Sequence, residues 1–262
     1  MSRPTAAQLI QPPPQTGKGS LEAGQVRVRQ HLNPLARRWR QPIQLPQDWY
    51  STAFEKPALP LVVDVGVAKG RFLLKLAKQD KTRNFLGIEI REPLVHQANR
   101  TAADAGLTNL IYLAGNANVS LLRILNDAPL GVLRDVYIQF CDPWFKKRHA
   151  KRRMVNNQLV RDVHNVLAKS RQQMVQRNGS VPVEPRLFVQ SDVFEVAVEM
   201  TQLFDHHGGF SRVRSEGNLA IDENGWLLGN PIGIPTERET AVLSKGGAIY
   251  RALYHIKDSE YG

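Results

Sequence analysis

The segment richest in chemically useful side chains follows a short apolar run near the middle of the chain. It begins Asp142-Pro143-Trp144-Phe145 and continues at residues 146–153 as Lys-Lys-Arg-His-Ala-Lys-Arg-Arg. The first four residues place a carboxylate, a rigid bend and an aromatic face next to one another, which suits a pocket the size of a nucleobase. The basic octet 146–153 can hold the phosphates around a base extruded into that pocket. A charge run alone is usually a solvated face, but its position beside this turn favours nucleic-acid binding.

Four polar residues fall at the ends of apolar, strand-like runs: Asp64, Glu89, Asn116 and Asp142. In sheets of parallel strands, ligands bind beyond the carboxyl ends of the strands. A nucleotide-containing cofactor is therefore expected at this edge. The four residues are compatible with either a dinucleotide or S-adenosylmethionine (SAM).

The turn after the first strand-like run, Gly66-Val67-Ala68-Lys69-Gly70, uses small residues that let a backbone approach a ligand. Ala68 stands where dinucleotide-binding turns have their middle glycine, so the turn alone does not separate a cofactor loop from a structural one. Glu89 comes 19 residues after Gly70, where an acidic group can accept both hydroxyls of a ribose. Asn116 fits an amide bonded to an adenine edge, and it fits equally an asparagine that caps a loop.

Charge and composition narrow the class of partner. The chain has 262 residues and a net charge of +11, of which residues 1–50 carry +5 and the octet carries +6. A neutral body with two basic segments indicates a polyanionic partner, and nucleic acid is the first candidate. The single cysteine, Cys141, excludes an intramolecular disulfide and a cysteine-cluster metal site, so we expect no metal and a cytoplasmic location. No apolar run approaches the roughly 20 residues of a membrane-spanning helix, so no membrane is expected.

Hydrophobic periodicity predicts an α/β fold from residue 58 onward. Strands are expected at 61–65, 84–90, 110–113, 135–140 and 187–190, and helices at 70–79, 92–105, 118–126, 156–168 and 193–206. Beyond residue 206 we expect no helix, only strands near 210–213 and 249–256. This order predicts a Rossmann-like, doubly wound, mostly parallel sheet with a C-terminal antiparallel strand pair. Residues 58–262 would form this domain, preceded by a flexible tail (1–25) and a basic N-terminal arm (26–57) that is extended at 26–29.

Two blocks of the sequence resemble the tRNA (guanine-N7)-methyltransferases of bacterial type. They are Asp142-Pro143-Trp144-Phe145-Lys146-Lys147-Arg148-His149 with Lys151-Arg152-Arg153, and Gly233-Ile234-Pro235-Thr236-Glu237-Arg238-Glu239, which looks like the family's Thr-x-x-Glu substrate motif. The resemblance runs from about residue 26 to the end of the chain. It implies a class I SAM-dependent methyltransferase fold, SAM as methyl donor, tRNA as substrate, and methylation of guanosine 46 in the variable loop.

The resemblance also implies roles for individual residues. It assigns SAM to Asp64, Glu89, Asn116 and Asp142, with Gly66 added from the turn, and it makes Asp142 the active-site acid. It assigns the tRNA substrate to Lys146, Asp192, Thr236, Glu237, Arg238 and Glu239. Asp192 is equally compatible with an N-cap of the helix that follows, and the run 236–239 with a salt-bridged loop. Ala68 departs from the family pattern by adding a methyl group near the cofactor.

The chemistry of the implied reaction limits what the site must supply. N7 of guanine carries an in-plane lone pair and no proton, so its attack on a methyl group needs positioning and no general base. The purine becomes cationic during the reaction, so a carboxylate such as Asp142 near the base would stabilise the transition state. Lys146, four residues further on, suits a phosphate or guanine O6.

Two other classes of protein are compatible with parts of the sequence. A NAD-dependent dehydrogenase would explain the Gly66–Gly70 turn and Glu89, but not the basic octet, and no paired residues for hydride transfer are visible. An RNA-binding protein on a catalytically degenerate methyltransferase fold would explain the octet, although Glu89, Asp142 and Lys146 are all intact. The sequence does not indicate the oligomeric state.

Overall fold

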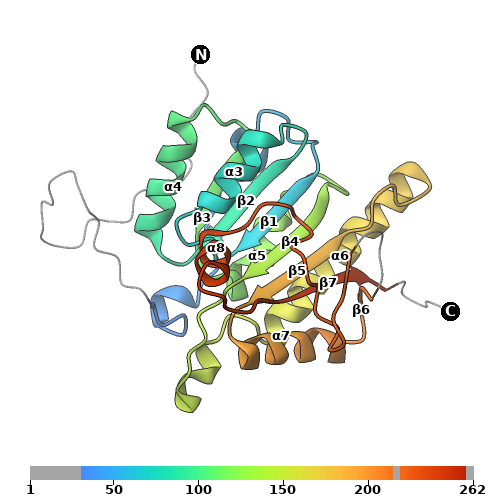
Figure 1. Ribbon diagram of the computed structural model, residues 1–262. Helices are drawn as coiled ribbons and strands as arrows, with labels where there is room; N and C mark the ends of the chain where they lie inside the picture. The colour runs from blue at the N-terminus through green and yellow to red at the C-terminus, as the bar shows by residue number, and fades with distance from the viewer. Residues whose placement is uncertain (1–30, 215–218, 258–262) are drawn as a thin grey trace, which may run out of the picture.

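A seven-stranded sheet runs through the computed structural model, which describes residues 31–214 and 219–257 (Figure 1). Its strands are β1 (Leu61–Val65), β2 (Asn84–Glu89), β3 (Leu110–Ala114), β4 (Leu133–Gln139), β5 (Arg186–Ser191), β6 (Phe210–Arg212) and β7 (Tyr250–Ile256). They lie in the order β3-β2-β1-β4-β5-β7-β6. The first five are parallel to one another, and β7 is antiparallel to both β5 and β6. The expected doubly wound sheet with a C-terminal antiparallel pair is confirmed.

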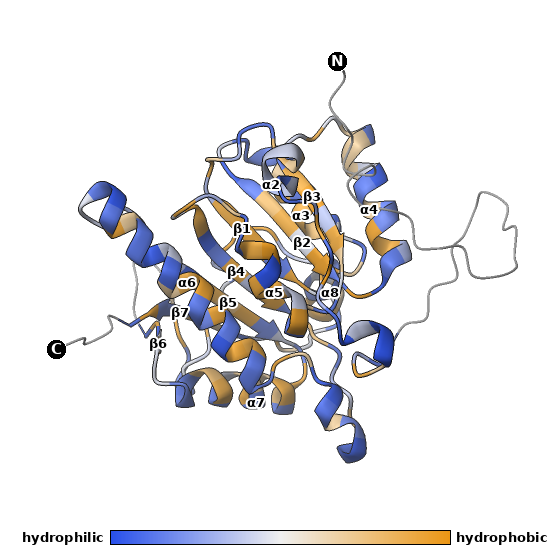
Figure 2. Ribbon diagram, turned by 180° about the vertical axis from the view of Figure 1, so that it is seen from behind, coloured by the Kyte–Doolittle hydropathy of each residue, from blue (hydrophilic) through white to orange (hydrophobic). Residues whose placement is uncertain are grey.

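Helices cover both faces of this sheet (Figures 1 and 2). One face carries α3 (Arg71–Gln79) and α4 (Glu92–Asp104), and the other carries α2 (Trp49–Ala53), α5 (Ala117–Leu125), α6 (Asn157–Asn178) and α7 (Phe194–His206). The short helices η1 (Arg37–Trp39), η2 (Lys147–Arg152) and α8 (Glu237–Leu243) lie outside these two layers. No helix in the described part of the chain is long and apolar enough to cross a bilayer.

Coverage of both faces explains the almost uninterrupted apolar run of β1. All five of its residues are buried, with Leu61, Val63 and Val65 in one core and Val62 in the other. Asp64 is the one residue of β1 that is not apolar. Its carboxyl group lies on the same face of the sheet as Val62. A polar residue kept at this position therefore indicates a ligand site near the end of the strand.

The N-terminal arm is described from residue 31 onward, so the predicted tail 1–25 and the extended stretch 26–29 lie outside the described residues. Within the described part, Trp49, Tyr50 and Phe54 are buried in the same core as β1 and β4. The aromatic side chains of this arm thus act as packing anchors against the sheet.

Helix α6 ends ten residues later than the sequence predicted, at Asn178 and not at Ala168. Its buried stripe continues through Ser170 and Met174, but the residues between them are polar and obscure the periodicity. Mostly hydrophilic residues lie on the side of α6 that faces the viewer in Figure 2. The helix ends at Gly179, whose φ of 72° suits a left-handed C-terminal cap.

The expectation of no helix beyond residue 206 is wrong, because α8 occupies Glu237–Leu243. Thr236 is its N-cap and forms a capping box with Glu239, in which each side chain bonds the backbone N–H of the other residue. Glu239 is buried and forms an ion pair with Arg251 of β7 at 2.8 Å. A Thr-x-x-Glu spacing is a helix-start signal as well as a family motif, and it was readable from the sequence.

Glu239→Ala should lower the free energy of unfolding by about 3–5 kcal/mol, since it leaves the buried guanidinium of Arg251 without its counter-charge. Equilibrium unfolding in urea measures the loss. Glu237→Ala on the same helix is the matched control, because its ion pair with Arg71 is about half exposed and such pairs are worth about 0–1 kcal/mol. Equal losses in the two variants would show that the buried pair does not hold α8 in place.

Candidate functional site

Two adjoining cavities lie at the carboxyl ends of the parallel strands. The larger, of about 690 Å³, extends from the β1 turn and the end of β4 to the start of α8. The smaller, of about 130 Å³, lies over the ends of β1, β2 and β3. Gly66, Arg91 and Asp142 belong to the walls of both. The cavities therefore form one site with two chambers.

The structure gathers all the predicted site residues in this site except Glu239. The larger chamber is lined by Asp64, Gly66, Asp142, Lys146, Asp192, Thr236, Glu237 and Arg238. The smaller chamber is lined by Gly66, Glu89, Asn116 and Asp142. Glu239 points away into the sheet edge, where Arg251 takes up its charge. The structure shows Glu239 in a structural role, and its assignment to the substrate stays a prediction.

The backbone around the chambers is strained. The non-glycine residues with positive φ in the described chain are Ala68 (51°), Phe140 (49°) and Trp144 (44°), and all three line the larger chamber. A side chain in this region costs on the order of 1 kcal/mol, and such strain gathers at binding and catalytic sites. Ala68 therefore carries a conformational cost that a glycine would not carry at this position of the turn.

Glu89 is buried at the end of β2 and is held by the turn of β1. Its Oε2 accepts from the backbone N–H of Ala68 at 2.8 Å, and its Oε1 accepts from the backbone N–H of Arg91 at 3.0 Å. The guanidinium of Arg91 adds two more bonds, at 2.9 and 3.0 Å. These bonds fix the carboxylate in place. A ligand hydroxyl that bonds to it must share it with the guanidinium of Arg91.

Asn116 combines capping with a contact to the N-terminal arm. Its Oδ1 accepts from the backbone N–H of Asn118 at 3.1 Å and so caps α5. Its Nδ2 donates to the carbonyls of Pro34 and Trp39, each at 3.2 Å. The capping alternative accounts for what the structure shows, and a bond to an adenine edge stays a prediction. Leu32 and Pro34 complete the wall of the smaller chamber.

Asp64 faces the larger chamber from the end of β1, with almost no solvent exposure. Burial raises the pKa of this carboxyl to about 7, although the N–H of Gln139, 3.3 Å from Oδ1, acts in the opposite direction. A group held at this pKa is close to the point where a nearby positive charge would ionise it. Asp64 is therefore suited to respond to a cationic ligand.

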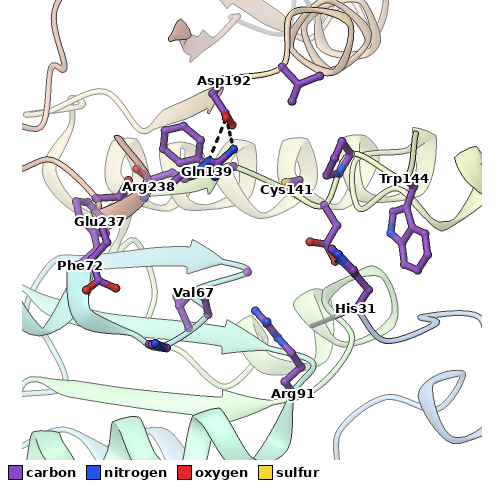
Figure 3. Close-up of a pocket in the computed structure, with 18 of the residues that line it drawn as sticks. His31, Val67, Phe72, Arg91, Gln139, Cys141, Trp144, Asp192, Glu237 and Arg238 are labelled. Carbon is purple, nitrogen blue, oxygen red and sulfur yellow. Dashed lines mark hydrogen bonds and ion pairs between the residues drawn. The ribbon is translucent and has the colours of Figure 1, made fainter. Parts of the chain in front are cut away.

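Asp142 lies where the two chambers meet. Its Oδ2 is 2.8 Å from Nδ1 of His31, a residue of the N-terminal arm that also contacts the ring of Trp144. In Figure 3, His31 and Trp144 lie at one end of the larger chamber, and Phe72 and Glu237 lie at the other. About half of the Asp142 side chain is exposed, so its carboxylate can reach a ligand in either chamber.

The wall that the start of α8 forms is held by two ion pairs. Arg238 donates to Asp192 from Nε at 3.0 Å and from a terminal nitrogen, as the dashed lines in Figure 3 show. Arg71, at the start of α3, pairs with Glu237. Asp192 is thus an ion-pair partner, and the alternative of an N-cap of α7 is wrong because Val193 occupies the cap position.

The basic octet does not present all of its charges to solvent. Lys147, Arg148 and Lys151 are exposed on η2, which protrudes beside η1 in both ribbon views (Figures 1 and 2). Arg153 donates to the carbonyl of Pro143 and pairs with Glu199, so it braces the turn. The guanidinium of Arg152 lies 5.1 Å from the centre of the Trp144 ring.

Several residues of the site carry no sequence signal of their own. His31, Arg71 and Arg91 reach it from segments whose positions only the fold determines. Phe145 follows Trp144 and is 75% exposed at the mouth of the larger chamber. Cys141 is not a reactive thiol, because burial raises the pKa of its side chain to about 12.

The fold and the site together are of the methyltransferase class, and comparison with known proteins gives the same answer. A family model described as "Putative methyltransferase" matches residues 58–252. The tRNA (guanine-N(7)-)-methyltransferase of Trichormus variabilis is 45% identical over 229 residues, which cover 87% of this chain and 95% of that protein. That of Prochlorococcus marinus is 38% identical over 227 residues, which cover 87% and 96%. The chain belongs to the tRNA (guanine-N7)-methyltransferase family.

Solved structures that resemble this one are more distant. The aminoglycoside resistance methyltransferase NpmB1 has 14% identity and a TM-score of 0.47, and the match covers 82% of this chain and 95% of that one. A SAM-dependent methyltransferase from Aquifex aeolicus has 13% identity and a TM-score of 0.44, over 76% and 85% of the two chains.

The raised pKa of Asp64 predicts a pH-dependent cost to stability. The unfolded carboxyl releases its proton near pH 4 and the folded one near pH 7, so the free energy of unfolding falls as pH rises between these values. The fall amounts to about 4 kcal/mol, at 1.36 kcal/mol per pH unit. Asp64→Asn removes this term, so its stability relative to wild type should rise from pH 4 to pH 7 and stay constant above. Urea unfolding of both proteins between pH 4 and 8 measures the difference, and a difference independent of pH would contradict the account.

Proposed function

We propose that the protein transfers the methyl group of SAM to N7 of guanosine 46 in the variable loop of tRNA, in the cytoplasm. The observation that carries this is the meeting of Asp64, Glu89 and Asp142 at one two-chambered site with an exposed basic helix, η2, beside it. Membership of the tRNA (guanine-N7)-methyltransferase family supports the choice of base and atom.

The residues of the smaller chamber fit the nucleoside part of SAM. Glu89 is an immobilised carboxylate that can accept ribose hydroxyls, and Gly66 leaves the backbone of the β1 turn open to a close approach. An added Cβ at Gly66 would lie 2.9 Å from Met154. When bound, SAM supplies an electrophilic methyl group on a cationic sulfonium. Asp64 and Asp142 are carboxyl groups on the walls of the site that can balance such a charge.

The larger chamber has the features that a guanine needs. Asp142 stabilises the positive charge that develops on the purine, and its hydrogen bond to His31 leaves Oδ1 free of that contact. Trp144 offers a ring face at the entrance, and Lys146 extends from its exposed position towards a phosphate or O6. Thr236, Glu237 and Arg238 close the opposite wall. No group has to remove a proton from N7, so the task of these residues is to hold the base in line.

The tRNA backbone is gripped by a basic surface that we define as η1 with Arg40 and η2. Arg37, Arg38 and Arg40 belong to the first part, and both parts protrude side by side next to the site (Figure 1). Phosphates near the variable loop would lie across both. The N-terminal arm and the octet therefore act on one stretch of RNA.

Incubation of the protein with labelled SAM and bulk unmodified tRNA, followed by nucleoside analysis, tests the proposed function. We expect label in 7-methylguanosine. Asp142→Asn at saturating SAM and tRNA should reduce the rate by on the order of 100-fold, the scale for removing one preorganised electrostatic group. Label in another nucleoside would contradict the proposal, and a rate within about twofold of wild type would remove Asp142 from the chemistry.

Replacement of Lys147, Arg148 and Lys151 by Ala should flatten the salt dependence of tRNA binding. Each lost phosphate contact removes roughly 0.7–0.9 from the slope of log K against log salt, so the three together should remove about 2. Filter-binding titrations at several salt concentrations measure this slope. The control replaces Lys169 and Arg177, which are exposed on α6, and should leave the slope unchanged. A wild-type slope in the triple variant would show that η2 is a solvated rim.

A further inference from the structure

A row of polar side chains crosses the sheet at the carboxyl edge. The neighbouring row of side chains on the same strands is apolar. Gln139 of β4, Gln190 of β5 and Arg251 of β7 are successive lateral neighbours in the strand register. The row one pleat back on the same face is Tyr137, Phe188 and Leu253, which belong to the hydrophobic core. With Asp64 and Glu239 at its two ends, the polar row is between 0% and 7% exposed. Burying polar groups so completely is costly unless every one is bonded.

The row is bonded head to tail from one end to the other. Arg251 Nε donates to Gln190 Oε1 at 3.2 Å, Gln190 Nε2 donates to Gln139 Oε1 at 2.8 Å, and Gln139 Nε2 donates to Asp64 Oδ1 at 3.3 Å. All three donors point towards Asp64. A chain of this kind is polarised from the guanidinium to the carboxyl group, so a change at either end alters each bond between them.

The far end of the row fixes the substrate-side wall. Glu239 accepts from Arg251 at 2.8 Å through Oε1, and through Oε2 it accepts from Asn230 at 2.8 Å and from the backbone N–H of Thr236 at 3.3 Å. These bonds hold the start of α8, from which Thr236, Glu237 and Arg238 face the larger chamber. The row therefore connects the acid beside the cofactor with the segment assigned to the tRNA substrate.

The amide of Gln190 joins the two ends of the row, because its Nε2 carries two N–H groups and donates one towards each end. Its Nε2 donates to Gln139 at 2.8 Å and is also 3.4 Å from Glu239 Oε2. When a cationic ligand favours the ionised form of Asp64, the bonds along the row strengthen and draw this amide towards Gln139. Glu239 Oε2 is then left to Asn230 and Thr236, which tightens the start of α8.

We propose that Gln139 and Gln190 are positioning residues that couple occupation of the SAM site to the tRNA-binding wall, so that each ligand increases the affinity of the other. This inference rests on the proposed function, since it takes SAM and tRNA as the two ligands. The coupling is reciprocal because it is a free energy shared by the two binding equilibria. Neither glutamine has to touch the reacting atoms for this role.

The experiment measures the dissociation constant of sinefungin, an unreactive cationic SAM analogue, by calorimetry with and without saturating tRNA. For wild type we expect tRNA to lower this constant at least about fivefold, the lower end of typical coupling between sites. Gln190→Met removes the amide at similar volume. Gln139→Met removes both bonds of Gln139, to Asp64 and to Gln190, while Arg251, Glu239 and Gln190 keep their mutual bonds. In both variants the ratio of the two constants should fall to within about twofold of one.

Phe188→Leu is the matched control, because it disturbs the apolar row one pleat back on the same strand and leaves the polar row intact. It should keep the wild-type ratio even though it loses stability. A wild-type ratio near one, or variants of Gln139 and Gln190 that retain the wild-type ratio, would overturn the coupling. If Gln190→Met does not fold, Gln139→Met decides alone. Failure of the wild-type protein to bind sinefungin or tRNA at all would overturn the proposed function, and the inference with it.

Discussion

The buried ion pair between Arg251 and Glu239 fixes the position of α8, whose first residues form one wall of the site. It joins the last strand of the sheet to a helix of only seven residues, α8, which has little apolar surface of its own to bury. Because both charges are removed from water, any displacement of α8 would leave one of them unpaired in the interior, at a cost of several kcal/mol. The start of α8, and with it Thr236 and Arg238, is thereby held against the carboxyl edge of the sheet. The position of this wall of the larger cavity therefore depends on the Arg251–Glu239 pair.

The opposite wall of the cavity differs from this one, because several of its residues raise the free energy of the folded protein. Ala68 and Trp144 adopt backbone conformations that disfavour side chains, and Asp64 is buried with a raised pKa and an amide as its main partner. These features lower the stability of the protein, and a nearby positive charge would offset the part that comes from Asp64. The fold can carry them because the two hydrophobic cores on either side of β1 are complete. The two hydrophobic cores supply the stability of the fold, and the residues at the carboxyl edge of the sheet are available for binding and catalysis.

The sequence predicted the parallel sheet and most of the residues at its carboxyl edge. An apolar run that ends in a polar residue indicates both a buried strand and the point at which that strand ends. The prediction failed where the role of a charged side chain depends on the ion-pair or hydrogen-bond partner that the fold brings to it. The role of Glu239 depends on Arg251, and the contact of Asp142 depends on His31, more than 100 residues earlier. The last ten residues of α6 were missed for a related reason, since Met174 is buried within a polar stretch whose periodicity is weak. Hydrophobic periodicity indicates which residues are buried, and it does not indicate which charged side chains form pairs.

We propose that the two chambers bring one guanine N7 and the methyl group of SAM together beside Asp142. To test this, a single tRNA transcript is methylated with the purified protein and the chain is then cleaved at 7-methylguanosine by borohydride reduction and aniline. We expect one cleavage, at guanosine 46, and none in a transcript that carries adenosine at that position. Cleavage at a different guanosine, or incorporation of methyl groups without any cleavage, would contradict it.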